Sequence, residues 1–188
     1  MKKLTLAFLS CVAIAATSFA GTASYSSGKS VKDYKTVEQP TCFSDTEIQA
    51  DVYGAYAVTE AGQGGVIKDH GFGGGIGLNY FFHRYFGIGA EGSWLHATER
   101  GGSAAVHGVG GSLFFRWPID SICLAPYVYM GGSAQIDGGS YAAFHAGGGL
   151  EYRVIPNKLG LFVDGRFNYL GSNDLHFTMV RAALRWVF

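Results

Sequence analysis

The strongest constraint on the fold is a run of alternating residues at the C-terminal end of the sequence, Asp174 to Phe188. From Val180 onward one set of alternate positions reads Val, Ala, Leu, Trp, Phe, whereas the other set includes Arg181 and Arg185. A β-strand has a period of two, so the two sets lie on opposite faces of one strand. A soluble sheet would bury the apolar face. A transmembrane barrel turns it to lipid and turns the charged face to the lumen.

The same alternation recurs along the chain and predicts eight strands. The expected strands are Glu47–Val58, His70–Phe82, Phe86–Ala97, Ala105–Trp117, Cys123–Ser133, Tyr141–Val154, Leu159–Leu170 and Asp174–Phe188. Strands of about ten to fourteen residues are longer than those of soluble sandwiches and long enough to cross a bilayer. An even number lets a meander close without a free edge, which lipid demands. We therefore predict an all-β fold, an eight-stranded antiparallel up-and-down transmembrane β-barrel.

One strand leaves its facing open. In Cys123–Ser133 both the set Leu124, Val128, Met130 and the pair Tyr127, Tyr129 are suited to face lipid. A soluble lipocalin-like barrel, with its apolar face inward, is the alternative for the whole fold. It would have to accommodate Trp186 and Phe188 together with an export signal.

Charged residues fall on the predicted inner face of six strands. They comprise both signs: Asp51, Glu91, Glu151, Asp164, Arg116, Arg153, Arg166, Arg181 and Arg185. An eight-stranded barrel has room for side chains and little else, so buried charges must pair or cost several kcal/mol. Glycines occupy the inner face of the second and third strands, and large side chains on the inner face of other strands would fill the space that glycine leaves. We predict a lumen charge network that plugs the interior.

Composition excludes several other classes. Lys+Arg and Asp+Glu are both 14, so no field of one sign would recruit nucleic acid. No run of eighteen apolar residues is present to form a membrane helix. Glycine is 29 of 188 residues and aromatics are 15%, which favours closely approaching strands with aromatic belts.

The N-terminal segment has the features of an export signal. Lys2 and Lys3 precede an apolar stretch, and Ser18-Phe19-Ala20 is a small-x-small site, so residues 1–20 are predicted to be a signal peptide cleaved after Ala20. Cys11 lies inside the apolar stretch, which disfavours the rival interpretation as a lipoprotein site. Residues 21–46 are polar and without period. We expect them to form a flexible periplasmic leader before the barrel, residues 47–188.

Taken together, these features resemble the small outer-membrane β-barrel family, the OmpA-like transmembrane domain and its opacity-like relatives. The features that support this resemblance are the alternating strands, G-F-G-G-G-I-G-L-N-Y-F at 71–81, G-I-G-A-E-G-S-W at 87–94 and the terminal R-W-V-F. The resemblance implies location in the outer membrane of a Gram-negative-type bacterium, outer-membrane lipid around the barrel, and a C-terminal signal for the barrel-assembly machinery. That signal maps to Val180, Leu184, Trp186 and Phe188.

With a periplasmic N-terminus, Cys42 and Cys123 both fall at the periplasmic rim. Export to an oxidising compartment allows a disulfide between them, with the leader folded across the barrel base; two separate thiols are the alternative.

Histidines are expected mostly at the outer strand ends: His70, His96, His107 and His176, with His145 slightly deeper and His83 at the inner rim. In one interpretation, imidazoles at these positions bind a metal or lipopolysaccharide phosphate. The favoured interpretation is an interfacial belt of polar and aromatic side chains, because the sequence has no pair of histidines at the spacing typical of metal ligands.

Function is less constrained than fold. We expect a monomeric, non-enzymatic protein without catalytic, cofactor or metal residues, acting in membrane integrity or in contact through short surface loops. A narrow passive, porin-like pore is the first alternative. A lipid-A-modifying enzyme using Ser172, Asp174 and His176 is less favoured, because the order of its residues does not match the family pattern.

Overall fold

The computed structural model describes residues 41–59, 70–99, 102–136, 140–171 and 175–188. The expected signal peptide and most of the expected leader lie outside these residues. The strands are β1 (Glu47–Thr59), β2 (His70–His83), β3 (Phe86–Glu99), β4 (Gly102–Arg116), β5 (Leu124–Ile136), β6 (Ser140–Ile155), β7 (Leu159–Leu170) and β8 (Leu175–Val187), with a short 3-10 helix η2 (Asp120–Ile122). Within the described ranges no helix is long and apolar enough to cross a membrane.

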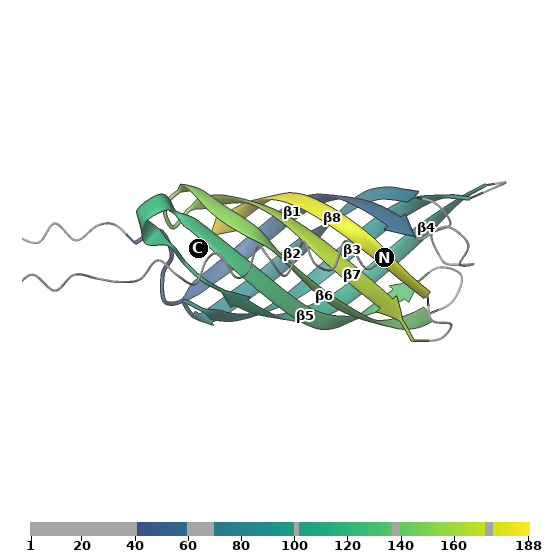
Figure 1. Cartoon of the computed structure of the whole chain (residues 1–188), viewed down its shortest axis with the longest axis horizontal. Helices are drawn as coiled ribbons and strands as arrows, with labels where there is room; N and C mark the ends of the chain where they lie inside the picture. The colour runs from purple at the N-terminus through teal and green to yellow at the C-terminus, as the bar shows by residue number, and fades with distance from the viewer. Residues whose placement is uncertain (1–40, 60–69, 100–101, 137–139, 172–174) are drawn as a thin grey trace, which may run out of the picture. The chain divides into compact units, whose positions relative to one another are not determined.

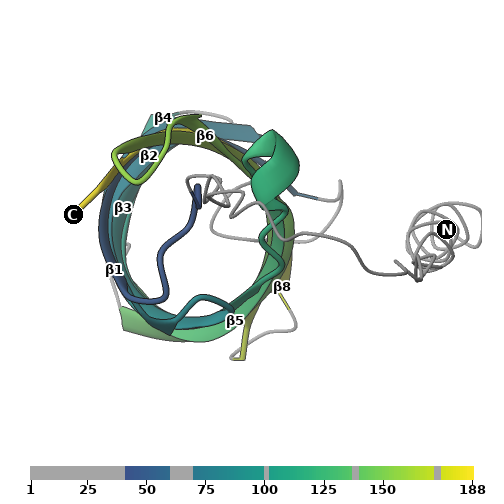
Figure 2. The same ribbon diagram turned by 90° about the vertical axis from the view of Figure 1, so that its left-hand side faces the viewer.

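The eight strands form one closed barrel in which every strand pairs antiparallel with its neighbours in sequence (Figure 1). β1 and β8 close the ring, and Ile48 and Phe188 exchange backbone hydrogen bonds of 2.9 and 3.2 Å there. The end-on view in Figure 2 shows the complete ring. The predicted fold class, strand order and antiparallel meander are therefore confirmed.

The ends of the barrel differ in their connections. At one end, the turn end, the strands join through residues 84–85, 117–123 and 156–158. At the opposite end, the loop end, the chain passes through residues 60–69, 100–101, 137–139 and 171–174. Strands β3, β4 and β5 extend two to three residues further toward the loop end than the sequence pattern indicates, because ladder pairing continues through polar residues such as Ser103 and Gln135.

Apolar side chains cover the outside of the wall. Val52, Ile76, Leu113 and Val163 are each at least half exposed although they lie in mid-strand. A continuous surface of this kind is the lipid-facing band of a transmembrane barrel. In β5 the two tyrosines turn inward, whereas Val128 and Met130 point outward, which decides the facing that the sequence left open.

Aromatic residues border this band at both ends. At the turn end the ring centroids of Phe86 and Phe115 are 5.3 Å apart, and those of Tyr85 and Trp117 are 6.3 Å apart. Toward the loop end Trp94, Phe144 and Tyr169 are exposed. Two such girdles are typical of the membrane–water interfaces of a barrel.

Glycines make room for large inward side chains. A Cβ atom at Gly75 would lie 2.3 Å from the Tyr53 hydroxyl, and one at Gly147 would lie 2.6 Å from the Tyr129 hydroxyl and 2.5 Å from a backbone oxygen. The contrast between glycine and bulky residues on the inner wall thus has a steric basis, and the two tyrosines occupy the space.

This arrangement gives a testable difference between two neighbouring glycines. Gly147→Ala is expected to lower the free energy of unfolding by about 1–3 kcal/mol, because the added carbon overpacks the lumen. Gly165→Ala, on the outer face of the adjacent strand, meets nothing within 4 Å and is expected to be nearly neutral. Urea titration of the refolded proteins measures both; equal effects would contradict the packing explanation.

The closed lumen as the candidate functional site

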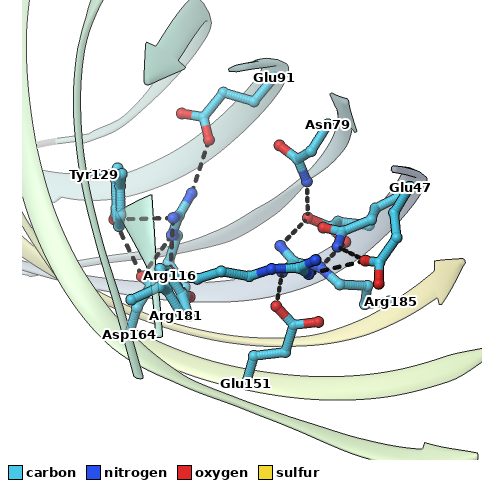
Figure 3. A network of polar contacts seen from close by, with 12 residues as sticks. Glu47, Asn79, Glu91, Arg116, Tyr129, Glu151, Asp164, Arg181 and Arg185 are labelled. Atoms are coloured by element: carbon cyan, nitrogen blue, oxygen red, sulfur yellow. Dashed lines mark hydrogen bonds and ion pairs between the residues drawn. The ribbon is translucent and has the colours of Figure 1, made fainter. Parts of the chain in front are cut away.

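Ionised side chains fill the interior in two chains of alternating sign. The first begins at the turn end and runs through Arg116, Glu47, Arg153, Glu151, Arg185 and Asp51, with successive N–O distances of 2.8, 2.6, 2.7, 2.7 and 2.7 Å. These residues come from β1, β4, β6 and β8, so the ion pairs span the lumen from wall to wall (Figure 3).

The second chain lies nearer the loop end and runs through Arg166, Glu91, Arg181 and Asp164. Arg166 contacts Glu91, which also binds Arg181 at 2.7 Å, and Arg181 contacts Asp164 at 2.8 Å. Arg181 reaches both oxygens of Asp164 through two nitrogens, each at 2.8 Å. Such bidentate contacts are the strong geometry for an arginine–carboxylate pair.

Each chain is electrically neutral. The first holds three arginines and three carboxylates, and the second holds two of each. The structure brings together all nine charged residues that the sequence placed in the lumen, and adds Glu47. Glu47 shares the parity of Gln49 and Asp51, so the period-two pattern contained the signal, but its position at the strand start concealed it.

Neutral polar groups and aromatic rings satisfy the remaining sides of these charges. Tyr127 and Tyr129 donate hydrogen bonds to Asp164 at 2.6 and 3.3 Å, and Asn79 donates to Asp51 at 2.7 Å. The Arg185 guanidinium lies 4.6 Å from the ring centroid of Phe162. Hydrogen bonds and cation–π contacts of this kind offset the desolvation of buried charge, although Arg153 Nε and Nη1 have no hydrogen-bond partner within the described residues.

A short segment before β1 covers the turn end of the barrel. Figure 2 shows this dark blue segment crossing inside the ring of strands. Phe43 is 1% exposed, and its ring lies 5.1 Å from the Arg116 guanidinium and 4.9 Å from that of Arg153. The last residues of the expected leader therefore pack into the barrel. No periodicity in the sequence predicts this packing.

A disulfide fastens this segment to the wall. Cys42 is joined to Cys123, with Cα atoms 5.3 Å apart and a sequence separation of 81 residues. The Cys42 amide also donates to Asp120 at 3.1 Å, and Asp120 pairs with Arg84 across the neighbouring turns. The hydrogen bond that Arg84 donates to the Asp120 carboxylate raises the pKa of Arg84 above its ordinary value.

Loss of the disulfide is expected to weaken the barrel measurably. Cys42→Ser with Cys123→Ser should lower the free energy of unfolding by about 2–4 kcal/mol, because an 81-residue loop is no longer constrained in the unfolded chain. Urea titration compares this variant with the oxidised protein and with the protein under dithiothreitol. If reductant destabilised the serine variant as much as the parent, the effect would not belong to this bond.

Apolar side chains close the lumen toward the loop end. Six inward residues there are buried: Ala57, Leu95, Val106, Ala143, Leu170 and Phe177. Between the two ends, the interior cavity beside Asp51, Tyr53 and Arg181 has a volume of about 10 Å³. That is near the lower limit for a single water molecule, so it is not a channel.

The other residues singled out by the sequence lie apart from the network. His145 is buried and its Nε2 is 2.8 Å from Ser112 Oγ inside the lumen. His176 lies on the outer wall with its ring 5.6 Å from Phe167, whereas Ser172 and Asp174 fall outside the described residues. No group of three metal-ligating side chains is found in the described part of the chain. Val180, Leu184, Trp186 and Phe188 all face outward and are exposed.

A closed, antiparallel, eight-stranded barrel with an apolar exterior and a polar plugged interior defines the class of small transmembrane β-barrels. No protein-family model matches the sequence, and no curated protein sequence matches it.

Solved structures do resemble it. Neisserial surface protein A superposes with a TM-score of 0.56 at 16% identity, covering 77% of this chain and 98% of that one. Ail, the attachment invasion locus protein of Yersinia pestis, gives 0.57 at 14% identity, over 77% and 100%. The N-terminal β-barrel domain of Pseudomonas aeruginosa OprF gives 0.52 at 12% identity, over 74% and 97%. At these identities the likeness establishes the fold alone.

Proposed function

We propose that this chain is an outer-membrane protein of a Gram-negative-type bacterium whose closed barrel serves as an anchor. It contributes to membrane integrity or holds its loops at the cell surface for contact, and it neither conducts solutes nor catalyses a reaction. The observation that carries this proposal is the neutral lumen, in which every charged side chain of the two chains is ion-paired, with Phe43 at one end and apolar residues at the other.

The biogenesis of such a protein follows from the same features. Residues 1–20 would direct export and be removed, residues 21–46 would form the leader, and residues 47–188 the barrel. The exposed alternating residues at the end of β8 would be read by the assembly machinery; they are Val180, Leu184, Trp186 and Phe188. A disulfide at the turn end is consistent with an oxidising periplasm on that side.

Likeness to surface proteins supports the role in contact. Two of the similar structures are named as a surface protein and an attachment protein, and the latter was solved with a heparin analogue. At 12–16% identity they share the fold with this chain, so what those proteins bind is not transferred to it.

A narrow passive pore is the competing function. It would need a continuous aqueous path, whereas ion pairs fill the lumen of the described barrel from the turn end to its middle and apolar side chains fill it toward the loop end. Arginine–carboxylate pairs would have to separate for ions to pass, at a cost of several kcal/mol per pair.

Deletion of the gene in its own host tests this function. Cells lacking the protein are expected to become more sensitive to detergent or to lose a surface adhesion phenotype, whereas uptake of a small hydrophilic solute stays unchanged. Re-expression should restore detergent resistance or adhesion and leave solute uptake unaltered. If deletion instead lowered solute uptake, re-expression restored it, and neither detergent sensitivity nor adhesion changed, the protein would be a pore.

A further inference from the structure

Two arginines at the turn end of the lumen share a single carboxylate oxygen. Arg116 Nη1 lies 2.8 Å and Arg153 Nη2 lies 2.6 Å from the same Oε2 atom of Glu47. Glu151, which also contacts Arg153, is shared with Arg185. The first ion-pair chain begins with an arginine at this end and finishes with a carboxylate in the middle of the lumen, so its positive end points toward the turn end.

Some nitrogen atoms of these two guanidinium groups are available to a further acceptor. Arg153 is 1% exposed, and its Nε and Nη1 atoms have no hydrogen-bond partner in the part of the chain that the structure describes. Arg116 Nη2 lies 3.5 Å from the Ser44 carbonyl oxygen, which is long for a hydrogen bond. Buried N–H groups without an acceptor are costly, so these donors indicate a place for an anion beside the positive end of the chain.

Residues 41–46, here called the cover segment, lie over both guanidinium groups. The ring of Phe43 is buried, 5.1 Å from the Arg116 guanidinium and 4.9 Å from that of Arg153. Figure 2 shows this dark blue segment inside the ring of strands. Because the phenyl ring occupies the space over both groups, an anion in solution cannot reach them while the segment is in place.

Hydrogen bonds and the disulfide hold the cover segment. The Asn157 side chain donates to the Thr41 carbonyl oxygen at 2.9 Å and accepts from Ser44 Oγ at 3.0 Å. The Cys42 amide donates to Asp120 at 3.1 Å. A few hydrogen bonds and one buried ring are comparable in free energy with the conformational entropy that the segment regains on release, so the covalent bond decides whether it stays.

A reductant can open this disulfide at its more exposed end. Cys123 is partly exposed, whereas Cys42 is buried. The thiolate of a dithiol attacks the Cys123 sulfur, the S–S bond breaks, and Cys42 leaves as a thiolate that takes up a proton. The second thiol of the reductant then displaces Cys123 and closes the reductant's own disulfide, so two electrons and two protons have passed to the protein.

We propose that Arg116 and Arg153 form a binding site for a small oxyanion such as phosphate, and that the disulfide-linked cover segment keeps this site closed. Reduction releases the segment together with the exposed carboxylate of Asp45. The forked donors of two guanidinium groups then match the geometry of a tetrahedral oxyanion. The site lies at one end of the lumen, so anion binding does not require ions to cross the barrel, and its test is independent of the proposed role as an anchor.

Calorimetric titration of the refolded protein with inorganic phosphate, in detergent micelles at constant ionic strength, tests the proposal. The oxidised protein is expected to bind phosphate weakly or not at all. After reduction with dithiothreitol, the apparent affinity should rise by about tenfold or more, because a larger fraction of molecules has an open site. Cys42→Ser with Cys123→Ser should bind phosphate like the reduced protein, with or without dithiothreitol.

Alkylation of the two thiols reports separately on reduction and on release of the cover segment. After reduction, modification of Cys123 by a maleimide shows that the disulfide is open. Cys42 is buried while the segment is in place, so its modification shows that the segment has left. Mass spectrometry of peptides counts both. A Cys42 that stays protected although Cys123 reacts would overturn the proposal, since the cover would then stay closed without its disulfide.

Conservative substitution of either arginine locates the site. Arg153→Lys keeps the charge but removes the forked donors, and should weaken phosphate binding by the reduced protein about tenfold. Arg116→Lys should have the same effect, and heat-modifiable gel migration confirms that each variant folds. Lys158→Gln removes an exposed cation at the same end and should leave phosphate binding unchanged.

Three results of the titration would overturn the proposal. The first is phosphate binding that is equal in the oxidised and the reduced protein, since the site would then not be covered. The second is binding that survives both arginine substitutions, since the anion would then lie elsewhere. The third is the absence of binding after Cys42 has become reactive, since the uncovered arginines would then not hold an anion.

Discussion

Arg185→Met is expected to lower the free energy of unfolding of the barrel by about 3–5 kcal/mol. Arg185 joins Asp51 and Glu151, each at 2.7 Å, in the fully buried middle of the lumen. Methionine fills much of the same volume but leaves two carboxylates without their shared cation. Breaking a buried pair in this way is costly, because the uncompensated charge stays in the interior.

Urea titration in detergent micelles, followed by tryptophan fluorescence and gel migration, measures this loss. The matched control is Arg84→Met, which removes the arginine of a partly exposed pair with Asp120 at the turn end. Exposed pairs contribute about 1 kcal/mol or less, so the control should shift the midpoint only slightly. Similar losses in the two variants would mean that the central ion pairs stabilise the barrel no more than this partly exposed pair does.

Glu47→Gln is the second substitution with a large expected effect, again about 3–5 kcal/mol. One oxygen of Glu47 binds both Arg116 and Arg153, and the other accepts the Ser44 amide at 2.6 Å. Glutamine keeps the shape but removes the charge, so two buried guanidinium groups lose their common partner. Its amide nitrogen would also oppose a donor, whichever way it turned.

The control for this substitution is Asp45→Asn, which changes an exposed carboxylate two residues away. It is expected to alter the unfolding free energy by less than about 0.5 kcal/mol. Limited proteolysis adds a second readout, because loosening of the Phe43 segment should accelerate cleavage near Thr41 in the glutamine variant. An unfolding midpoint unchanged from the parent would show that the charge of Glu47 does not stabilise the barrel.

Period-two alternation was sufficient to predict the barrel, its eight strands and the inner charged face. It works because each wall residue must face either lipid or lumen, and the two environments select opposite chemistry. Arg181 and Arg185 were assigned to the inner face from this rule alone. The rule did not identify the carboxylate partner of each arginine, because the pairing depends on strand register and barrel shear rather than on position in the chain.

Three parts of the site had no such signal. The tyrosines of β5 were ambiguous because an aromatic ring suits both a lipid interface and a polar lumen. Phe43 lies in a segment without period, which the Cys42–Cys123 disulfide and hydrogen bonds such as that from the Cys42 amide to Asp120 hold against the barrel. The pattern did not predict the apolar layer around Leu95 and Val106, because apolar residues at inward positions weaken the alternation itself.

Single-channel recording of the refolded chain, residues 21–188, in a planar bilayer tests the central claim that the lumen is closed. Insertion is established first by heat-modifiable migration and by protection of the barrel from protease. The expected result is insertion without discrete current steps at any applied voltage below about 100 mV, since such a field supplies only about 2.3 kcal/mol per elementary charge. Reproducible ohmic steps from inserted protein would contradict the claim, because ions would then pass a network that the ion pairs should close.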